Sequence, residues 1–359
     1  MQVRDIATIR LASQQIVSSA CNEPSSVVAR LLAMQAQDYR GALWSIGLRL
    51  PGSTVRQVEQ AIADRTIVRT WPMRRTLHFV AAEDARWMLR LLTPRAIRGM
   101  AGRLAQLGID DAVLARSRSA FRKVLDAHAL LTREEMYAVL ARAKLSPAGQ
   151  RGIHIISRLS QEGLLCLGPH RGKAPTFTLM DRWVPPSREL DRDEALAKLT
   201  SRYFRGHGPA TIRDFAWWSG ITLGDARAGA TMIGEELLEE RVNGTSYLVS
   251  RSAAAPGDDA QRHARGMHLL PGFDEYMLGY SDRTIALDLA HAQKIVPGNN
   301  GVFLPTIVAR GRVIGTWRAA TVRGRTTVIP LPFAPLSASG TRAFAAAAKR
   351  YRQFQQLEE

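Results

Sequence analysis

Two glutamines one residue apart, Gln35 and Gln37, combine a residue type and a spacing that could do chemistry. A side-chain amide does not titrate near neutral pH, so it can position a water molecule but cannot deprotonate it strongly. Such a pair therefore suits hydrolysis of a bond that is already weak. An ordinary pair of polar surface residues is the alternative interpretation.

The backbone around the two glutamines decides whether they can share a site. On a regular helix, side chains two positions apart diverge by about 200°. They point to the same side only where the backbone is extended. We therefore expect the preceding apolar helix to end near Met34, and Gly41 is compatible with irregular backbone just beyond the pair.

The charge of the chain favours a polyanionic partner. Its 359 residues include 49 Lys and Arg against 32 Asp and Glu, for a formal net charge of +17. The basic residues are unevenly placed, because residues 289–357 contain no acidic residue and a second basic stretch covers 65–103. This pattern favours nucleic acid over a general solubility charge. Duplex DNA that carries a cationic, alkylated base offers both a polyanion and a weak bond.

Periodicity and turn signals predict an α+β fold of tandem winged helix–turn–helix domains with a small C-terminal β-rich module. Helices over 112–127, 132–143 and 150–162 precede a hairpin of residues 164–167 and 176–179. The order recurs with helices over 193–203, 211–217 and 222–238 and a hairpin over 240–249 that turns at Asn243-Gly244. We expect a winged-helix-like domain with both glutamines at 1–105, winged helices at 106–188 and 189–252, a linker over 252–261, and the β-rich module with a terminal helix at 262–359.

The N-terminal part alternates helical and extended patterns. Helices are expected over 3–20, from Pro24 and over 82–100, and extended segments over 67–71 and 76–80, with Pro72 ending the first. Alternation from Arg74 into the second extended segment would place Arg74, Thr76 and His78 on one polar face.

Three sequence blocks carry a family resemblance: residues 34–49, residues 69–79, and residues 269–276 with Asp282-Arg283. They resemble the AlkZ/YcaQ-like winged-helix family of bacterial DNA glycosylases, and the likeness extends over residues 5 to about 335. The AlkZ branch carries Gln-φ-Gln, where φ is apolar, whereas the YcaQ branch has Asp at the second position. Gln37 places this chain nearer AlkZ, with Ala36 as a small φ residue.

The resemblance implies that Gln35 and Gln37 are catalytic and that the activity is excision of bulky N7-alkylated bases and unhooking of interstrand cross-links. Alkylation at N7 makes the base cationic, so it leaves without a general acid. The amides would orient water at the anomeric carbon. No lysine lies near the motif, which disfavours Schiff-base chemistry and predicts a monofunctional enzyme.

Further site residues are expected in the sequence blocks and at hairpin tips. The expected DNA contacts are Arg40, Trp44, Arg69, Arg74, Arg75, Thr76, His78, His170, Arg171, Lys173, Arg323 and Arg325. Alternatively, the residues at the hairpin tips belong to solvated turns, and those around Thr76 lie on an edge strand exposed to solvent. His78 could also be a hydrogen-bonded structural histidine. We expect Asp274, Glu275, Asp282 and Arg283 to form structural salt bridges that lock domains together, in place of an acid/base pair or a metal site. Trp217 and Trp218 are expected in the core between helices, and not as a platform on which bases stack.

Several classes of protein do not fit the sequence. Cys21 and Cys166 are the two cysteines, which argues against a disulfide framework and against a zinc or iron–sulfur site. We expect no metal and no cofactor. The first residues lack the apolar core of a signal peptide, and no apolar run approaches 18 residues. The expected location is the cytoplasm, at the nucleoid and away from membranes, and the expected state is a monomer.

The resulting hypothesis is a monofunctional DNA glycosylase that hydrolyses the N-glycosidic bond of N7-alkylated purines in double-stranded DNA. The expected substrates include bulky adducts and interstrand cross-links. The expected role is DNA repair or self-resistance to a DNA-alkylating natural product. A non-catalytic winged-helix transcriptional regulator is the alternative, and it should dimerise and prefer one operator sequence. A catalytically idle family member that sequesters lesions is a third possibility.

Overall fold

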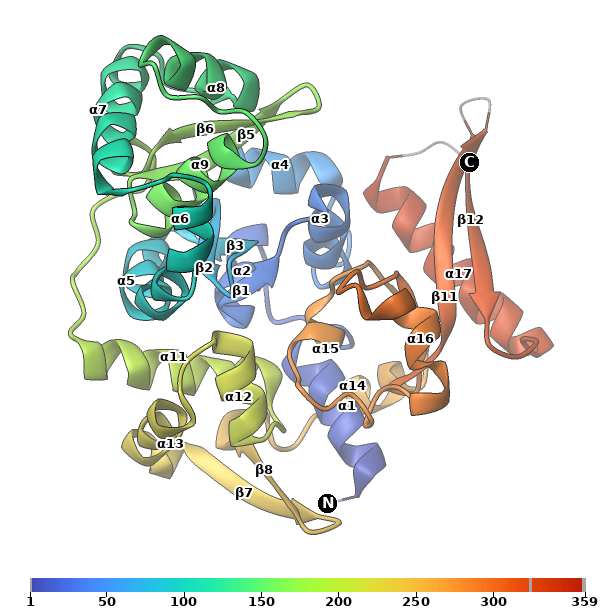
Figure 1. Cartoon of the computed structure of the whole chain (residues 1–359). Coiled ribbons are helices and arrows are strands. Elements are labelled where there is room, and N and C mark those ends of the chain that lie inside the picture. Colours follow the sequence, from blue (N-terminus) through green and yellow to red (C-terminus); the bar gives the residue numbers. More distant parts are fainter. Residues whose placement is uncertain (1, 323–324, 357–359) are drawn as a thin grey trace. The chain divides into compact units, whose positions relative to one another are not determined.

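The computed structural model describes residues 2–322 and 325–356 and has a mixed α/β fold (Figure 1). Contacts between residues divide the chain into two compact units. The first unit contains Met1–Val58, Leu196–Trp218 and Thr222–Glu359, and the second contains Glu59–Ala195 and Ser219–Ile221. Within the described residues, no helix is both long enough and apolar enough to span a membrane.

The N-terminal segment of the first unit is mostly helical. Its elements are α1 (Val3–Ser13), α2 (Pro24–Leu31), β1 (Ala33–Gln35), α3 (Tyr39–Leu48) and the start of α4 (Val55–Ala63). The helix expected over 3–20 was too long, because Gln15 adopts a φ of 59° just after α1, which a helix cannot accommodate.

The second segment of the first unit is three helices and a hairpin. These are α11 (Arg192–His207), α12 (Ile212–Ser219), α13 (Leu223–Met232), β7 (Leu237–Val242) and β8 (Thr245–Ser250). The helix expected over 222–238 was too long, because β7 already pairs with β8 from Leu237, opposite Ser250. The expected turn at Asn243-Gly244 is confirmed, with φ of 51° and 77°.

The C-terminal segment of the first unit contains a four-stranded antiparallel sheet in the order β12-β11-β10-β9. Its strands are β9 (Met267–Leu270), β10 (Thr306–Ala309), β11 (Arg312–Val322) and β12 (Arg325–Pro332). The helices are α14 (Asp258–Ala264), α15 (Glu275–Leu278), α16 (Ala292–Ile295) and α17 (Ala338–Phe354). The expected linker over 252–261 is therefore partly helical.

The second unit is built on the strands β3, β2, β5, β6 and β4, which lie side by side in this order. The strands are β2 (Ile67–Met73), β3 (Thr76–Ala81), β4 (Leu131–Thr132), β5 (Leu165–Arg171) and β6 (Ala174–Leu179). Pro72 does not end β2. It lies within a shift of register between Thr70 and Met73, where the ladder needs no donor from proline.

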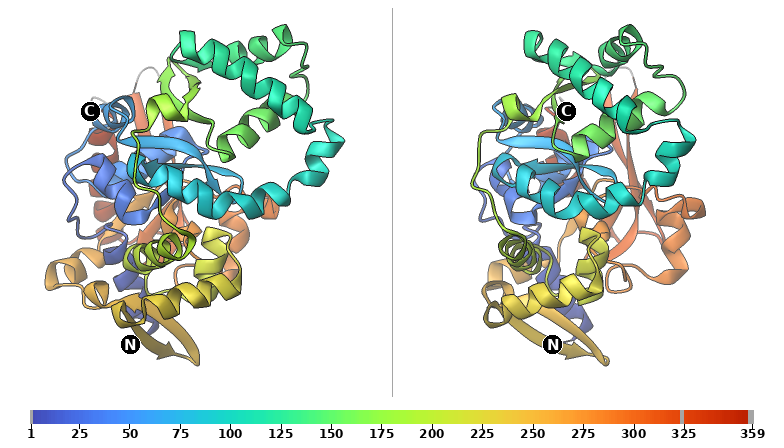
Figure 2. Two further views of the ribbon diagram at one scale, coloured as in Figure 1. Left: turned by 90° about the vertical axis from the view of Figure 1, so that its left-hand side faces the viewer. Right: turned by 60° about the vertical axis from the view of Figure 1, so that its left-hand side comes forward.

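Helices of the second unit pack on this sheet. They are α5 (Ala82–Arg98), α6 (Ala101–Gln106), α7 (Asp111–Ala127), α8 (Arg133–Arg142), α9 (Arg151–Gln161) and α10 (Met180–Trp183). The three helices expected before the hairpin are confirmed as α7, α8 and α9 (Figure 2). Helix α7 contacts α8 and α9, and all three helices contact the hairpin of β5 and β6. Thr132 and Glu135 form the capping box that starts α8.

Candidate active site

The backbone at the two glutamines is not helical. Helix α2 ends at Leu31, and Leu32 takes a φ of 66° that turns the chain out of the helix and into β1. Gln35 is the last residue of β1, and Gln37 lies in the bend that follows. Asp38 then starts α3 by accepting a hydrogen bond from the Gly41 backbone at 3.2 Å. The irregular backbone that a shared site requires is therefore present.

The side chains of the two glutamines meet. Gln35 Nε2 donates a hydrogen bond to Gln37 Oε1 at 2.7 Å. Gln35 is half-buried and Gln37 is exposed, so the paired amides lie at the surface of the first unit. An approaching ligand can reach them without any rearrangement of the core.

Glu275 holds the backbone of the first glutamine. Its Oε1 accepts a hydrogen bond from the Gln35 backbone N–H at 3.1 Å. Its Oε2 accepts one from Trp218 Nε1 at 2.8 Å and lies 3.4 Å from His207 Nε2. Glu275 is 1% exposed, and both of its oxygens have partners within the protein. This carboxylate therefore positions Gln35 and does not face solvent.

Asp274, the neighbour of Glu275, forms a buried ion pair with α3. Its two oxygens each accept a hydrogen bond from the Arg49 guanidinium at 2.8 Å, and neither side chain is exposed. Ser45 Oγ donates to Asp274 Oδ2 at 2.6 Å. Arg49 Nη2 also donates to Gln14 Oε1 at 3.0 Å, and Gln14 Nε2 donates to the Glu275 carbonyl at 3.2 Å. Helices α1, α3 and α15 are thereby joined behind the glutamines.

The other two residues of the expected salt-bridge group make backbone contacts. Asp282 Oδ1 accepts a hydrogen bond from the Thr284 backbone at 2.9 Å. Arg283 Nε donates to the Met277 carbonyl at 2.8 Å. Both therefore hold the chain that follows α15.

The two tryptophans expected in the core differ from each other. Trp218 is fully buried, but Trp217 is 40% exposed, so the expectation for Trp217 was wrong. Successive residues of a helix point about 100° apart, so Trp217 can face outward while Trp218 points into the core.

A DNA contact by the Trp44 side chain does not fit its placement, whereas Arg40 is exposed on the first turn of α3. Trp44 is 4% exposed, and its Nε1 donates to the Leu269 carbonyl at 2.8 Å. Its ring also packs edge-on against Tyr351 of α17, at 5.3 Å between ring centroids. A side chain enclosed in this way stabilises the core and cannot reach a duplex.

In the second unit, expected DNA-binding residues pair with one another. Arg74 Nη2 lies 3.2 Å from His78 Nε2, and His78 Nδ1 lies 2.9 Å from the Thr76 carbonyl. Arg69 Nη1 lies 3.3 Å from His170 Nε2. Arg69 and His78 are buried, so these side chains lie within the unit and a direct DNA contact by either does not fit their placement. Burial, aided by the charge of Arg69, lowers the pKa of His170 to about 4, so its imidazole is neutral at physiological pH.

Exposed basic residues lie at the turns of the second unit. Arg75 is exposed between β2 and β3. At the tip of the β5–β6 hairpin, Lys173 is exposed, while Arg171 pairs with Glu135 at 3.0 Å. Arg323 lies outside the described residues, and so does the side chain of Arg325.

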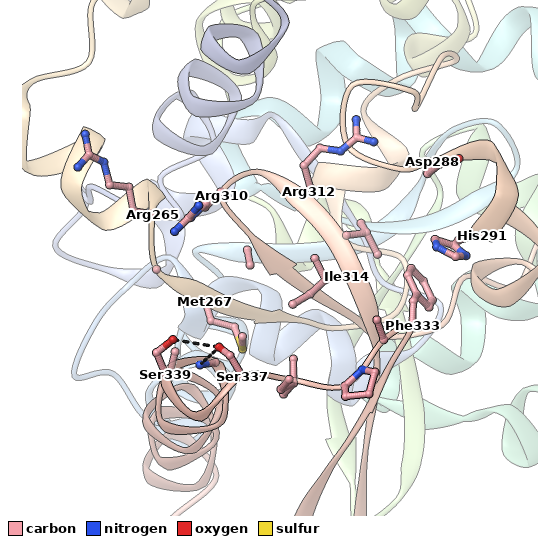
Figure 3. A pocket seen from close by; sticks show the side chains of 18 residues that line it. Arg265, Met267, Asp288, His291, Arg310, Arg312, Ile314, Phe333, Ser337 and Ser339 are labelled. Carbon is pink, nitrogen blue, oxygen red and sulfur yellow. Dashed lines mark hydrogen bonds between the residues drawn. The ribbon is translucent and has the colours of Figure 1, made fainter.

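A separate cavity of the first unit, of about 790 Å³, is drawn in Figure 3. Arg265, Arg310 and Arg312 line it, together with Ser337 and Ser339 at the start of α17. Neither Gln35 nor Gln37, both among the described residues, lines this cavity. Within the described residues, no group of three or more His, Cys, Asp or Glu side chains is placed to hold a metal ion.

Comparison with known proteins identifies the family. The family model for AlkZ-like DNA glycosylases matches residues 28–354, which include both glutamines and Glu275. The chain belongs to this AlkZ-like family of DNA glycosylases. The resemblance inferred from the sequence blocks is thereby confirmed.

Two matches from Streptomyces sahachiroi agree with the family assignment of this AlkZ-like chain. An interstrand DNA cross-link repair glycosylase is 27% identical over 357 residues, which cover 92% of this chain and 90% of that protein. The solved structure of the DNA glycosylase AlkZ has a TM-score of 0.79 and 24% identity, and the match covers 99% of this chain and 97% of that one. This likeness shows that the AlkZ-like fold extends over nearly the whole chain.

Sequence reasoning missed the residues of this AlkZ-like protein that support Gln35 from behind, namely Gln14, Ser45, Arg49 and His207. One signal was available. Arg49 ends an otherwise apolar stretch, and a charge in such a stretch needs a buried counter-charge. Nothing in the sequence identifies Asp274 as that partner, because 225 positions separate the two residues.

Proposed function

We propose that the protein hydrolyses the N-glycosidic bond of N7-alkylated purines in duplex DNA, with Gln35 and Gln37 as the catalytic residues. The observation that carries the proposal is the 2.7 Å hydrogen bond between their amides at the surface end of β1. Family membership supports the glycosylase reaction and a place in DNA repair.

The paired amides are suited to orient one water molecule. Each amide oxygen has two lone pairs, and the hydrogen bond from Gln35 uses one lone pair of Gln37 Oε1. The second lone pair of that oxygen and Gln35 Oε1 can accept the two hydrogens of a single water. The water then presents its own lone pair to the anomeric carbon, which is a gain in orientation and not in basicity.

The chemistry of the leaving group makes a strong base unnecessary. A purine alkylated at N7 is cationic and departs as a neutral base, leaving oxocarbenium character on the sugar. The phosphates on either side of the lesion stabilise that positive charge. Residues 34–49 contain no lysine to form a Schiff base with the sugar, so we propose a monofunctional enzyme.

We extend the substrate range to bulky adducts and interstrand cross-links because a relative is named as a cross-link repair glycosylase. Such a base cannot be flipped easily into a tight pocket, and an exposed pair of amides suits a lesion that stays in place. We propose that the protein acts as a monomer in DNA repair or in self-resistance to a DNA-alkylating natural product.

We also propose that the chain folds as winged helices over the sequence ranges given above. The order of three helices followed by a hairpin occurs twice along the chain and supports this proposal. The first copy is α7, α8 and α9 with β5 and β6, and the second is α11, α12 and α13 with β7 and β8.

A base-release assay tests the proposed reaction. A duplex with a single N7-methylguanine is incubated with the protein, and one half of the sample is then heated in alkali. We expect free N7-methylguanine, with strand cleavage after alkali and none before it, in several sequence contexts. Cleavage without alkali would contradict the monofunctional mechanism. Sequence-specific binding without base release would instead support a transcriptional regulator.

A further inference from the structure

A partly exposed aromatic and cationic cluster lies on the first unit. Trp217 of α12 is 40% exposed, and Arg283 Cζ lies 5.1 Å from the centre of its ring. The same Cζ lies 4.9 Å from the ring of Phe303. Phe303 in turn lies 6.3 Å from Phe273, centroid to centroid. Trp217, Arg283, Phe303 and Phe273 are called the Trp217 cluster below.

The Trp217 cluster is held rigidly. The hydrogen bond from Arg283 Nε to the Met277 carbonyl, at 2.8 Å, fixes the plane of the guanidinium. Trp217 belongs to a helix whose neighbouring residues Phe215 and Trp218 are fully buried. An ordered side chain that stays partly exposed binds a partner with little further loss of conformational entropy.

The cluster is tied to the glutamine pair through one carboxylate. Trp218, which follows Trp217, donates its indole N–H to Glu275 Oε2 at 2.8 Å. Glu275 Oε1 accepts the Gln35 backbone N–H at 3.1 Å. Phe273 precedes Glu275 by two residues, so both ends of the cluster adjoin the group that positions Gln35.

We propose that Trp217 and Arg283 contact the DNA at the lesion, so that the indole stacks on the opposite base as that base loses its partner and the guanidinium binds a neighbouring phosphate. The inference rests on the proposed function and names two further positioning residues for it. Stacking on an indole accepts any base, which suits an enzyme that recognises damage and not sequence. Arginine side chains both lie on aromatic rings and recognise phosphate, so one side chain suits both contacts.

Binding of a stable abasic duplex tests the indole without any catalytic step. Trp217→Ala should reduce the preference for a duplex with a tetrahydrofuran abasic site over the undamaged duplex by about tenfold. Trp217→Phe keeps a ring for stacking and should stay within about threefold of wild type. Leu289→Ala is the matched control, because Leu289 is a 73% exposed apolar residue of the same unit, and we expect no change.

Two further measurements complete the test. Trp217→Ala should also slow single-turnover release of N7-methylguanine by about tenfold, measured at a temperature at which circular dichroism shows the variant to be fully folded. Arg283→Gln should lower the slope of log affinity against log salt concentration by about one, as expected for one lost phosphate contact.

The outcomes separate this inference from the proposed function. If Trp217→Ala binds the abasic duplex as Leu289→Ala does, the stacking role is overturned. If Arg283→Gln leaves the slope of log affinity against log salt concentration unchanged, the proposed phosphate contact is overturned. If the wild-type protein releases no N7-methylguanine while Trp217→Ala still loses its preference for the abasic duplex, the reaction is wrong and the contact stands.

Discussion

Replacement of Gln35 or Gln37 by alanine should lower the single-turnover rate constant for release of N7-methylguanine by about 100-fold. The expected loss is large because each amide supplies one of the two acceptors that orient the attacking water. Binding of undamaged duplex should change little, since a small polar pair adds few contacts to the backbone. Quenched-flow release of labelled base, with enzyme in excess over duplex, measures this rate constant directly.

A matched glutamine controls for the substitution itself. Gln353 of α17 is exposed in the same unit, and Gln353→Ala should keep the wild-type rate constant. Circular dichroism should give the same melting temperature for all three variants, because Gln35 and Gln37 contribute little buried surface. Wild-type rates in Gln35→Ala and Gln37→Ala would remove both residues from the mechanism.

Replacement of Asp274 by alanine should lower the free energy of unfolding by about 3–5 kcal/mol. The change leaves the Arg49 guanidinium buried without a counter-charge, and Ser45 Oγ loses its acceptor. A loss of this size is a large share of the stability of a typical domain, about 5–15 kcal/mol. Urea denaturation followed by circular dichroism measures this loss. Base release should fall as well, because Asp274 caps α15, and the Glu275 that holds Gln35 belongs to this helix.

Asp259 provides the control for this ion pair. It pairs with Arg262 at the surface, where such a bridge is worth about 0–1 kcal/mol, so Asp259→Ala should be nearly as stable as wild type. The double variant Arg49→Leu with Asp274→Leu removes both buried charges. It should lower the free energy of unfolding by less than Asp274→Ala alone does. Equal stability of Asp274→Ala and Asp259→Ala would contradict a structural role for the buried pair.

Local signals in the sequence predicted much of the secondary structure. Helical periodicity and the capping box at Thr132 identified α8 and its neighbours, and Asn243-Gly244 identified a turn. Element ends were predicted less well. Gln15 and Leu32 adopt φ angles of 59° and 66°, which tertiary packing imposes on them. Neither residue type predicts a positive φ.

In the candidate site too, local features could be predicted from the sequence, whereas contacts between distant segments could not. The spacing of Gln35 and Gln37 led to the requirement for non-helical backbone, which the structure has, because only one residue separates the two in sequence. Glu275 meets Gln35 across 240 positions, and that contact depends on how α15 packs against β1 and α3. The exposure of Trp217 and the burial of Trp44 likewise follow from packing between distant segments, which periodicity within one helix does not determine.

The most direct test of the paired-amide mechanism is a double-mutant cycle on Gln35 and Gln37, read out as single-turnover release of N7-methylguanine. If the two amides orient one water together, the double alanine variant should be about as slow as either single variant, about 100-fold below wild type. Losses that multiply to about 10⁴-fold would mean that the two residues act independently, which contradicts the mechanism.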